Sequence, residues 1–418
     1  MRYKTPRLTA GAVTCALVAA SLAACGSSSS SSNSTGAATA AKPSTPPPAA
    51  STSPLVAGLP AELKQQYAGL PSPPTASAWA DFKAVKKPWK VCYAESFQGN
   101  PWRVALANQI KQLAAQYKQA GLVGSFTMSV ADNDVARQNQ QIRQFVDQGC
   151  SIIFSVAASA TGLNAAIKAA HDKGIPFVTM AGSVTSPYAI NVDSNYSVLG
   201  QQLAQDAAQA SKDVLMVKGI EGQPIAVQQN EAAKKQWSQD GTKIVAEVNG
   251  NWTPSVTKDA VLKALATHPG DIGAVWSTGS ESAIIAQAFK QAGRKPPLIT
   301  SSISGDALGY WKQNSGTFKF EGAAIMPSWT GQTGWRVGMR TLAGNGPKIN
   351  PIMVPIPKVA SSDLATLYKP CMKPDSSSVF PVVAQDPLAG SLMDAYFTKP
   401  GETGPFDYAK TPDPCAGA

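Results

Sequence analysis

The side chains that most often perform catalysis are scarce in this chain and poorly placed for it. His171 and His268 are the only histidines, and both fall where a helical pattern ends. A partly positive side chain there interacts favourably with the helix dipole, so we expect a structural role. The segment Gly279–Ala283 (GSESA) resembles a turn that presents a nucleophilic serine, but it lacks the closing glycine and has no histidine placed as a base. We therefore predict no catalytic residues and no enzymatic activity.

Motifs for metals and cofactors are also missing from the sequence. There is no His-Glu-x-x-His, no paired Cys-x-x-Cys and no glycine-rich phosphate loop ending in lysine. Asp132 and Asp134 come closest to a metal-binding cluster, but they stand directly before a helical pattern. An aspartate in that place usually caps the helix. We predict that the protein holds neither a metal nor a cofactor.

The first segment has the composition of an export signal. Three basic residues lie within the first seven positions, and an apolar stretch runs from Leu8 to Ala20. This order, followed by small residues, is typical of a secretory signal and too short to span a bilayer comfortably. Leu22–Cys25 resembles a bacterial lipobox, whose cysteine is acylated and becomes the mature N-terminus. We predict a signal peptide at residues 1–24, a lipidated Cys25 and a protein anchored outside the cytoplasmic membrane.

Behind Cys25 the composition predicts a flexible linker and then two domains. Residues 25–54 are mostly Ser, Thr, Ala, Gly and Pro, with Lys42 as the one charged residue. Such a segment cannot bury enough apolar surface to form a core. About 360 residues remain, which is enough for two domains of ordinary size.

The excess positive charge is spread along the chain. The formal net charge falls from +10 to +7 once residues 1–24 are removed, because they hold three basic side chains and no acidic one. No cluster of Lys and Arg concentrates the remainder, so we expect no binding to nucleic acid.

Four cysteines remain in the exported chain. Cys92, Cys150, Cys371 and Cys415 would meet an oxidising environment, where disulfides form and persist. Four cysteines allow three pairings, and free thiols are the alternative.

From Lys90 onward, short apolar runs alternate with amphipathic helical patterns such as the one from Val135 to Gln148. Several runs are continuously apolar, as expected for parallel strands covered on both faces. Alternation of this kind predicts an α/β fold of doubly wound parallel sheets. The ten predicted strands are Val91–Ala94, Ser125–Val130, Ser151–Val156, Phe177–Met180, Ile190–Val192, Val214–Lys218, Lys243–Val248, Ala274–Ser277, Leu298–Thr300 and Phe320–Ile325.

The order of the motifs from about Lys90 to Ala343 resembles the sugar-binding branch of the type I periplasmic binding proteins, the solute-capturing subunits of ABC importers. The segments that carry the resemblance keep the order of that family: Gly99–Trp102, Asp132–Asp134, Gln140–Ile142, Gln148–Ile153, Gly174–Thr179, Asp193–Asn195 with Gly200, His268–Trp276 and Ala292–Arg294.

The resemblance implies two sheet domains joined by three hinge strands, with a ligand held between them. Chain crossings are expected near Ala210–Lys212, Met326–Ser328 and Gly344–Ile349. The implied domains are residues 90–210 with 327–345 and residues 211–326 with 346–418, preceded by an N-terminal extension at 55–89. Ligands of open α/β sheets bind beyond the carboxyl ends of the strands, so the loops there are the candidate site.

Members of this family often stack aromatic side chains on the faces of a sugar ring. Trp102 takes the position of one stacking aromatic, with Asn100 as its polar partner, and Trp252 matches the opposing one. The resemblance therefore implies a ligand held between Trp102 and Trp252.

The sequence departs from the family at most of its charged positions. Ala181-Gly182 replaces the usual Asp-Arg pair, Gly279-Ser280 replaces Asn-Asp, and Asn230 takes the place of an arginine. The charged network that commonly holds a simple sugar is therefore largely absent, and other charged residues would supply another one. The full predicted ligand-binding set is Phe97, Asn100, Trp102, Arg103, Glu221, Asn230, Trp252, Gly279, Ser280, Glu281, Asp306 and Trp329.

The strand order that the resemblance implies places the strands at Cys92 and Cys150 side by side, so these two cysteines are expected to pair. Cys371 and Cys415 then pair in the Pro-rich C-terminal segment. We expect a monomeric solute-binding lipoprotein that delivers a sugar-like ligand to ABC permease subunits. A lipid-anchored sensor with the same clamshell is the alternative, and an exported hydrolase is a less favoured third.

Overall fold

The computed structural model describes residues 53–70, 72–382, 388, 390–406 and 413–415. The predicted signal peptide, Cys25 and the linker up to residue 52 lie outside these residues. None of the helices in the described part is both long enough and apolar enough to cross a membrane.

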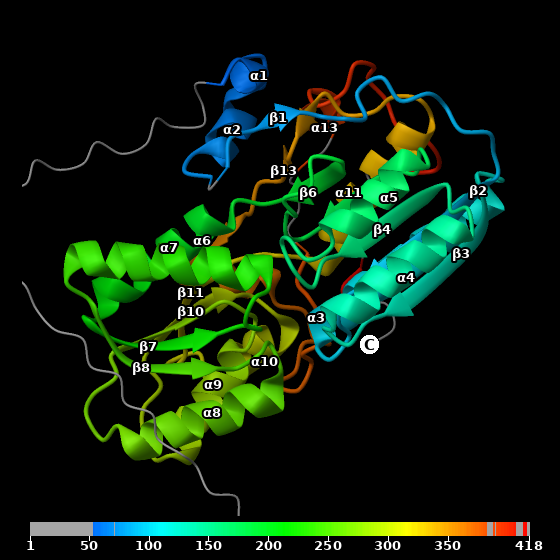
Figure 1. Cartoon of the computed structure of the whole chain (residues 1–418). Helices are drawn as coiled ribbons and strands as arrows, with labels where there is room; N and C mark the ends of the chain where they lie inside the picture. Colours follow the sequence, from blue (N-terminus) through cyan, green and yellow to red (C-terminus); the bar gives the residue numbers. More distant parts are fainter. Residues whose placement is uncertain (1–52, 71, 383–387, 389, 407–412, 416–418) are drawn as a thin grey trace, which may run out of the picture. The chain divides into compact units, whose positions relative to one another are not determined.

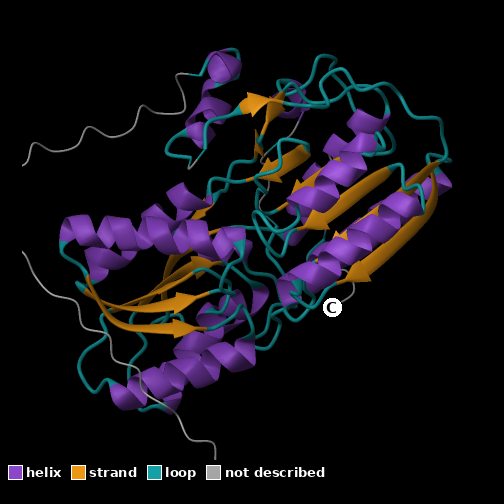
Figure 2. Cartoon of the chain, in the orientation of Figure 1, coloured by secondary structure: helices purple, strands orange, loops and turns teal. Residues whose placement is uncertain are grey.

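Two six-stranded sheets form the framework of the protein (Figures 1 and 2). The first is parallel throughout and has the order β13 (Ile352–Met353), β6 (Ala189–Asp193), β5 (Phe177–Met180), β4 (Ile152–Val156), β2 (Trp89–Glu95), β3 (Val123–Val130). The second has the order β14 (Lys358–Val359), β11 (Lys319–Ala323), β10 (Leu298–Ser302), β9 (Ala274–Ser277), β7 (Asp213–Lys218), β8 (Lys243–Asn249). It is parallel except for the edge pair β11–β14. All ten predicted strands are present.

Helices cover both faces of the first sheet, because successive strand residues point to opposite sides. Val91 and Tyr93 of β2 belong to the core under α3 (Pro101–Gln119) and α11 (Pro327–Leu342), which pack against each other. Cys92 and Ala94 belong to the core under α4 (Val135–Asp147) and α5 (Asn164–Asp172). We call this sheet with its helices the first half.

The second sheet is covered in the same way. One face packs on α6 (Tyr196–Ala210) and α7 (Pro224–Asp240), with Trp237 and Trp276 in the core between them. The other face packs on α8 (Pro254–Thr267), α9 (Ser282–Gln291) and α10 (Gly305–Gln313). This sheet with its helices is the second half, and the predicted class of two doubly wound parallel sheets is confirmed.

The chain passes between the halves at places that differ from the prediction. The first crossing, predicted near Ala210–Lys212, lies earlier, between β6 and α6, because α6 packs against α7, β7, β9, β10 and β11. The second crossing, between β11 and α11, lies at 324–326, close to the predicted position. The third joins β13 in the first sheet to β14 in the second and lies at 354–357 instead of 344–349. A helical pattern alone does not say which sheet its apolar face will cover.

The N-terminal extension packs on the first half. It contains α1 (Pro54–Ala57), α2 (Ala61–Lys64), the 3-10 turn η2 (Gln65–Tyr67) and β1 (Thr75–Ala76), which pairs with β12 (Ile349–Asn350). Its apolar side chains, including Tyr67 and Trp79, are buried in the first-half core. Asn195, the N-cap of α6 at the first crossing, donates hydrogen bonds to the carbonyls of Gln66 and Ala68. The extension therefore supports the point where the chain first changes halves.

The C-terminal segment contacts both halves, which corrects the assignment of residues 346–418 to the second domain. The turn η3 (Ser361–Asp363), α12 (Leu364–Leu367) and the stretch up to Val379 pack on the second half. Leu388, α13 (Gly390–Asp394) and Phe397 instead pack in the first-half core. Glu402 then forms ion pairs with Arg336 and Arg340 of α11, at 3.0 and 2.8 Å.

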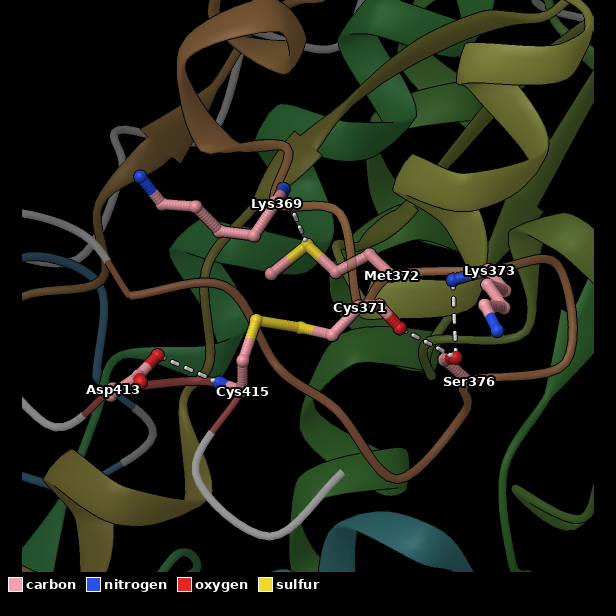
Figure 3. The surroundings of a disulfide bond; sticks show 7 residues. All are labelled: Lys369, Cys371, Met372, Lys373, Ser376, Asp413 and Cys415. Atoms are coloured by element: carbon pink, nitrogen blue, oxygen red, sulfur yellow. Dashed lines mark hydrogen bonds between the residues drawn. A yellow bond between two sulfur atoms is a disulfide. The ribbon is translucent and has the colours of Figure 1, made fainter.

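Both disulfides form with the pairings given in the sequence analysis. Cys92 and Cys150 are bridged between neighbouring strands of the first sheet, with a Cα–Cα distance of 6.1 Å. Cys371 and Cys415 are bridged in the C-terminal segment at 5.7 Å (Figure 3).

Candidate functional site

A cavity open to solvent lies where loops at the carboxyl ends of both sheets meet. Its wall contains the start of α3 from the first half, and the segment Thr278–Glu281 from the second. Ile325, at the second crossing, and Ser377, in the C-terminal segment, also line the cavity. The cavity is therefore built from both halves and from a chain passage between them.

The start of α3 forms the first-half wall. Asn100 is the N-cap of this helix, and its side-chain oxygen accepts a hydrogen bond from the amide of Arg103 at 2.8 Å. Pro101 follows at the first helical position, where a missing N–H costs nothing. The indole of Trp102 donates to the carbonyl of Ile325 at 2.7 Å, so its ring is held at the crossing. The Asn-Pro-Trp run thus starts the helix and fixes the aromatic wall of the cavity.

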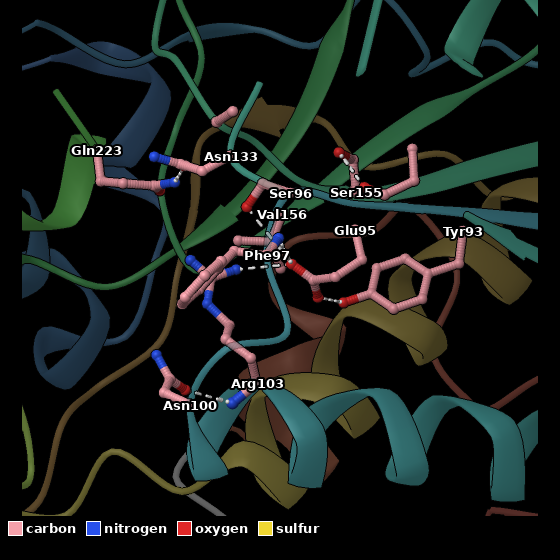
Figure 4. A network of polar contacts seen from close by, with 12 residues as sticks. Tyr93, Glu95, Ser96, Phe97, Asn100, Arg103, Asn133, Ser155, Val156 and Gln223 are labelled. Carbon is pink, nitrogen blue, oxygen red and sulfur yellow. Dashed lines mark hydrogen bonds and ion pairs between the residues drawn. The ribbon is translucent and has the colours of Figure 1, made fainter. Parts of the chain in front are cut away.

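Arg103 is the cation of the cavity wall, and it is already paired. Its guanidinium lies 3.0 Å from the carboxylate of Glu95, and the two side chains are 2% and 0% exposed (Figure 4). Tyr93 and the amide of Phe97 also donate hydrogen bonds to Glu95. Burial raises the pKa of Glu95, while the guanidinium opposes that rise. The Nη2 group of Arg103 has no partner among the described residues, so it remains available as a donor.

Trp252 forms the aromatic wall of the second half, and the backbone there is unusual. Asn251 and Trp252 both have a φ of 53°, a region that side chains other than glycine rarely adopt. The indole lies over Gly219, where a Cβ atom would overlap the ring. Its N–H donates to the hydroxyl of Thr278 at 2.9 Å. A strained turn and a glycine therefore place this ring in the cavity.

Two acidic side chains, Glu281 and Asp306, also line the cavity. Each is 6% exposed. Their side-chain partners are hydroxyls: Ser277 lies 3.5 Å from Glu281, and Ser304 lies 2.5 Å from Asp306. Burial raises the pKa of Glu281 to about 7 and that of Asp306 to about 6, and the negative charge of Asp306 contributes to the rise at Glu281.

Eight of the predicted site residues line the cavity, namely Asn100, Trp102, Arg103, Trp252, Gly279, Ser280, Glu281 and Asp306. The other four lie elsewhere. Phe97 lies in the loop after β2, where its amide donates to Glu95, and Glu221 is exposed in the turn after β7. Asn230 is two turns into α7 and does not line the cavity, and Trp329 is 5% exposed in the second-half core.

The loop Ala181–Thr185, at the carboxyl end of β5, contributes no residue to the lining of this cavity. Asp193, buried at the end of β6, accepts hydrogen bonds from the amides of Gly182 and Ser183. These contacts draw the loop towards the first crossing, where Ala181 lines a smaller cavity.

Several lining residues were missed by the sequence analysis. Tyr196 and Ile225 are at the starts of α6 and α7, and Ile284 is in the first turn of α9. The cap Asn195 and the helix-starting Pro224 were signals for the first two, because helix starts that follow strands face the carboxyl edge of a sheet. No local pattern indicated Ser377, which reaches the cavity from the far end of the sequence.

The arrangement is suited to binding. Aromatic faces can cover the apolar faces of a ring, while the buried arginine, carboxyl and serine groups supply donors and acceptors for a polar rim. In the described residues, no group of three or more His, Cys, Asp or Glu side chains is arranged to hold a metal ion. His171 and His268 lie at the ends of α5 and α8, outside the cavity lining.

Two parallel sheets that enclose a polar and aromatic cavity between their carboxyl-end loops define a two-lobed ligand-binding protein. The chain belongs to the periplasmic binding protein domain family, whose model matches residues 93–345. This membership confirms the predicted type I periplasmic binding protein and the expectation of a binding protein rather than an enzyme.

Individual proteins of known structure or name agree with this membership. The chain is 27% identical over 245 residues to the galactofuranose-binding protein YtfQ of Escherichia coli K12, covering 55% of this chain and 75% of that protein. An ABC transporter solute binding protein from Thermobispora bispora superposes with a TM-score of 0.63 at 25% identity, covering 69% and 90% of the two chains. The arabinose-transporter binding protein of Shewanella sp. ANA-3, bound to arabinofuranose, shares the fold with a TM-score of 0.59 at 22% identity, covering 66% and 93%.

Proposed function

We propose that this protein captures a sugar or sugar-like polyol outside the cytoplasmic membrane, delivers it to the permease of an ABC importer and is anchored through an acylated Cys25. The observation that carries the proposal is the placement of Trp102 and Trp252, from different halves, in one cavity with a polar rim. Sugars present apolar C–H faces and polar edges, which fit such a site. The galactofuranose ligand named for YtfQ supports a ligand of this class.

A thermal-shift screen of sugars and polyols on the purified protein tests ligand capture. A ligand at one hundred times its dissociation constant should add about 2.7 kcal/mol to the free energy of unfolding. Titration calorimetry then measures the affinity of the best compound. If no compound of this class raises the melting temperature, the proposal is wrong.

Trp102→Ala and Trp252→Ala test the assignment of the cavity. Each change removes a large apolar contact, so we expect the affinity to fall about 10- to 100-fold, or ~1.4–2.8 kcal/mol. Trp311→Ala is the matched control, because Trp311 packs beside Tyr368 and does not line the cavity. Two variants that both bind within twofold of the wild type would show that the ligand lies elsewhere.

Anchoring and transport need a cellular test. We expect Cys25→Ala to leave the protein unprocessed or to release it from the membrane, and to reduce uptake of the labelled ligand. Mass spectrometry of the wild type should show an acylated Cys25. An unmodified cysteine, or uptake that is unaffected by loss of the protein, would refute lipid anchoring or transport, respectively.

A further inference from the structure

The wall of the cavity has more acidic than basic side chains. Arg103, Glu281 and Asp306 are the charged residues of its wall. The guanidinium of Arg103 forms an ion pair with the carboxylate of Glu95, which does not line the cavity, at 3.0 Å. Glu281 and Asp306 are therefore the charged residues of the wall that, among the described residues, have no opposite charge beside them.

Neither carboxyl has a cationic partner within the described part of the chain. Glu281 and Asp306 are each 6% exposed, and the side chains bonded to them are those of Ser277 and Ser304. They lie at the starts of α9 and α10, where backbone N–H groups supply partial positive charge but no full cation. Buried carboxylates usually have a paired cation, and without one their ionised form is disfavoured.

Two further features of the same wall suit a ligand that carries a cation on a polar ring. Trp102 and Trp252 offer aromatic faces, which attract ammonium groups as well as sugar C–H groups. Arg103 is 2% exposed, and its Nη2 group has no partner in the described structure, so it can donate to a ligand oxygen. This orphaned donor points to a ligand independently of the two carboxyls.

We infer that the ligand is a sugar or polyol that bears a protonated amine, with the ammonium group against Glu281 and Asp306 and a ring or hydroxyl oxygen near Arg103. The inference rests on the proposed function and narrows its ligand class. An ammonium group supplies both hydrogen bonds and the missing positive charge, whereas a hydroxyl supplies the hydrogen bonds alone.

The test compares amines with their neutral counterparts by titration calorimetry, near neutral pH and with EDTA present to remove divalent cations. The probes are D-galactosamine, D-galactose and N-acetyl-D-galactosamine, the corresponding glucose series, and an amino-inositol with myo-inositol. We expect at least one amine to bind about tenfold or more tightly than its neutral parent, since a charge-assisted hydrogen bond is stronger than a neutral one. The N-acetyl compound keeps the nitrogen but loses the charge and should lose the advantage.

Glu281→Gln with Asp306→Asn removes the negative charge while keeping the side-chain size. This double variant should bind the amine and its neutral parent equally, and the exposed Asp271→Asn should behave as the wild type. Circular dichroism and the melting temperature establish that each variant is folded. If the double variant does not fold, the comparison is made with whichever of the single variants, Glu281→Gln or Asp306→Asn, does fold.

The outcomes separate this inference from the proposed function. Tight binding of a neutral sugar or polyol, with equal or weaker binding of its amine, overturns the inference and leaves the proposed function intact. An amine preference that survives in the double variant also overturns it. If no sugar, polyol or amine binds, the proposed function fails and the inference fails with it.

Discussion

The two buried carboxyl groups of the cavity are useful as hydrogen-bond acceptors but costly as charges. Glu281 and Asp306 are acceptors that a polar ligand needs, but burial without a cation makes their charged forms unfavourable. Arg103 and Glu95 are also buried, but each has the opposite charge of the other beside it. Removing one member of such a buried pair leaves the other charge uncompensated and typically costs about 3–5 kcal/mol. Arg103 therefore stabilises the fold as well as lining the cavity.

The two cavity carboxyls predict a pH dependence of stability for the ligand-free protein. Their pKa values rise on folding from 4.5 to about 7 for Glu281 and from 3.8 to about 6 for Asp306. A raised pKa means that the folded state binds the proton more tightly, so this contribution is complete below about pH 4 and lost as the pH rises to about 7. The free energy of unfolding of the wild type, relative to Glu281→Gln with Asp306→Asn, should fall by a few kcal/mol over this range, since one pKa unit is about 1.4 kcal/mol.

Denaturant unfolding at a series of pH values measures this difference. The variant serves as the reference because other buried acids, such as Asp193, have raised pKa values in both proteins. A difference that stays flat or grows with pH would contradict the prediction.

At the scale of elements, short turns and helix starts set the positions of the Trp102 and Trp252 rings. The turn before α8 holds Trp252 in the left-handed region, and Gly219, directly after β7, leaves room for its ring. On the opposite wall, the cap and proline at the start of α3 set the direction of Trp102. Both rings depend on backbone features that carry no ligand chemistry themselves.

Gly219→Ala should weaken ligand binding about tenfold or more, or ~1.4 kcal/mol, because the new methyl group displaces the indole of Trp252. The fold should remain stable, since the φ of Gly219 is not in the left-handed region. Gly316→Ala is the control, because a Cβ there meets nothing within 4 Å. Calorimetry and melting temperatures are the measurements. Equal affinities for the two variants would show that Trp252 does not contact the ligand.

The Cys371–Cys415 bridge closes a loop whose described parts contact both halves. Gly305 and Gly309 of α10 lie directly against the backbone of residues 373–379, so this stretch is closely packed beside the cavity. Cys371→Ser with Cys415→Ser should destabilise this segment by up to about 4 kcal/mol, the loop-entropy value for a separation of 44 residues.

Hydrogen exchange and limited proteolysis should therefore show faster opening of residues 371–382 in that variant. Cys92→Ser with Cys150→Ser is the comparison, because its bridge lies in the first sheet and should leave exchange in this segment unchanged. Identical exchange in the wild type and the C-terminal variant would refute the prediction.

At the scale of the whole molecule, the two halves meet through contacts that do not line the cavity. The side chain of Gln223, at the start of α7, donates to that of Asn133, in the loop after β3 (Figure 4). Neither residue is part of the cavity lining. A contact of this kind favours the arrangement in which both walls reach the ligand, and a ligand that prefers this arrangement shifts the population towards it.

Asn133→Ala should therefore weaken ligand affinity a few-fold without altering any lining residue. The physical reason is that the binding-competent fraction falls, and the apparent dissociation constant rises in proportion. Gln201→Ala, which removes a hydrogen bond within the second half, is the control. The idea fails if calorimetry gives the same affinity for Asn133→Ala and the control.

The sequence by itself determined the strands, the fold class and part of the cavity wall. Continuous apolar runs are local signals, and segments such as Phe177–Met180 and Ala274–Ser277 have the bounds that those runs predicted. The site residues Asn100, Trp102 and Glu281 follow strands directly, so strand order places them at a carboxyl edge.

Only the tertiary structure decided which sheet each shared element joins and which residues from distant segments meet. The apolar face of α6 fits either sheet by pattern, and its packing against Trp237 and Trp276 selects the second. Ser377 reaches the cavity, and Glu402 reaches Arg336 and Arg340 across more than sixty residues of chain, through contacts that leave no period in the sequence. The pairing of Arg103 with Glu95, which leaves Glu281 and Asp306 without a cation, is likewise a property of side chains brought together by folding.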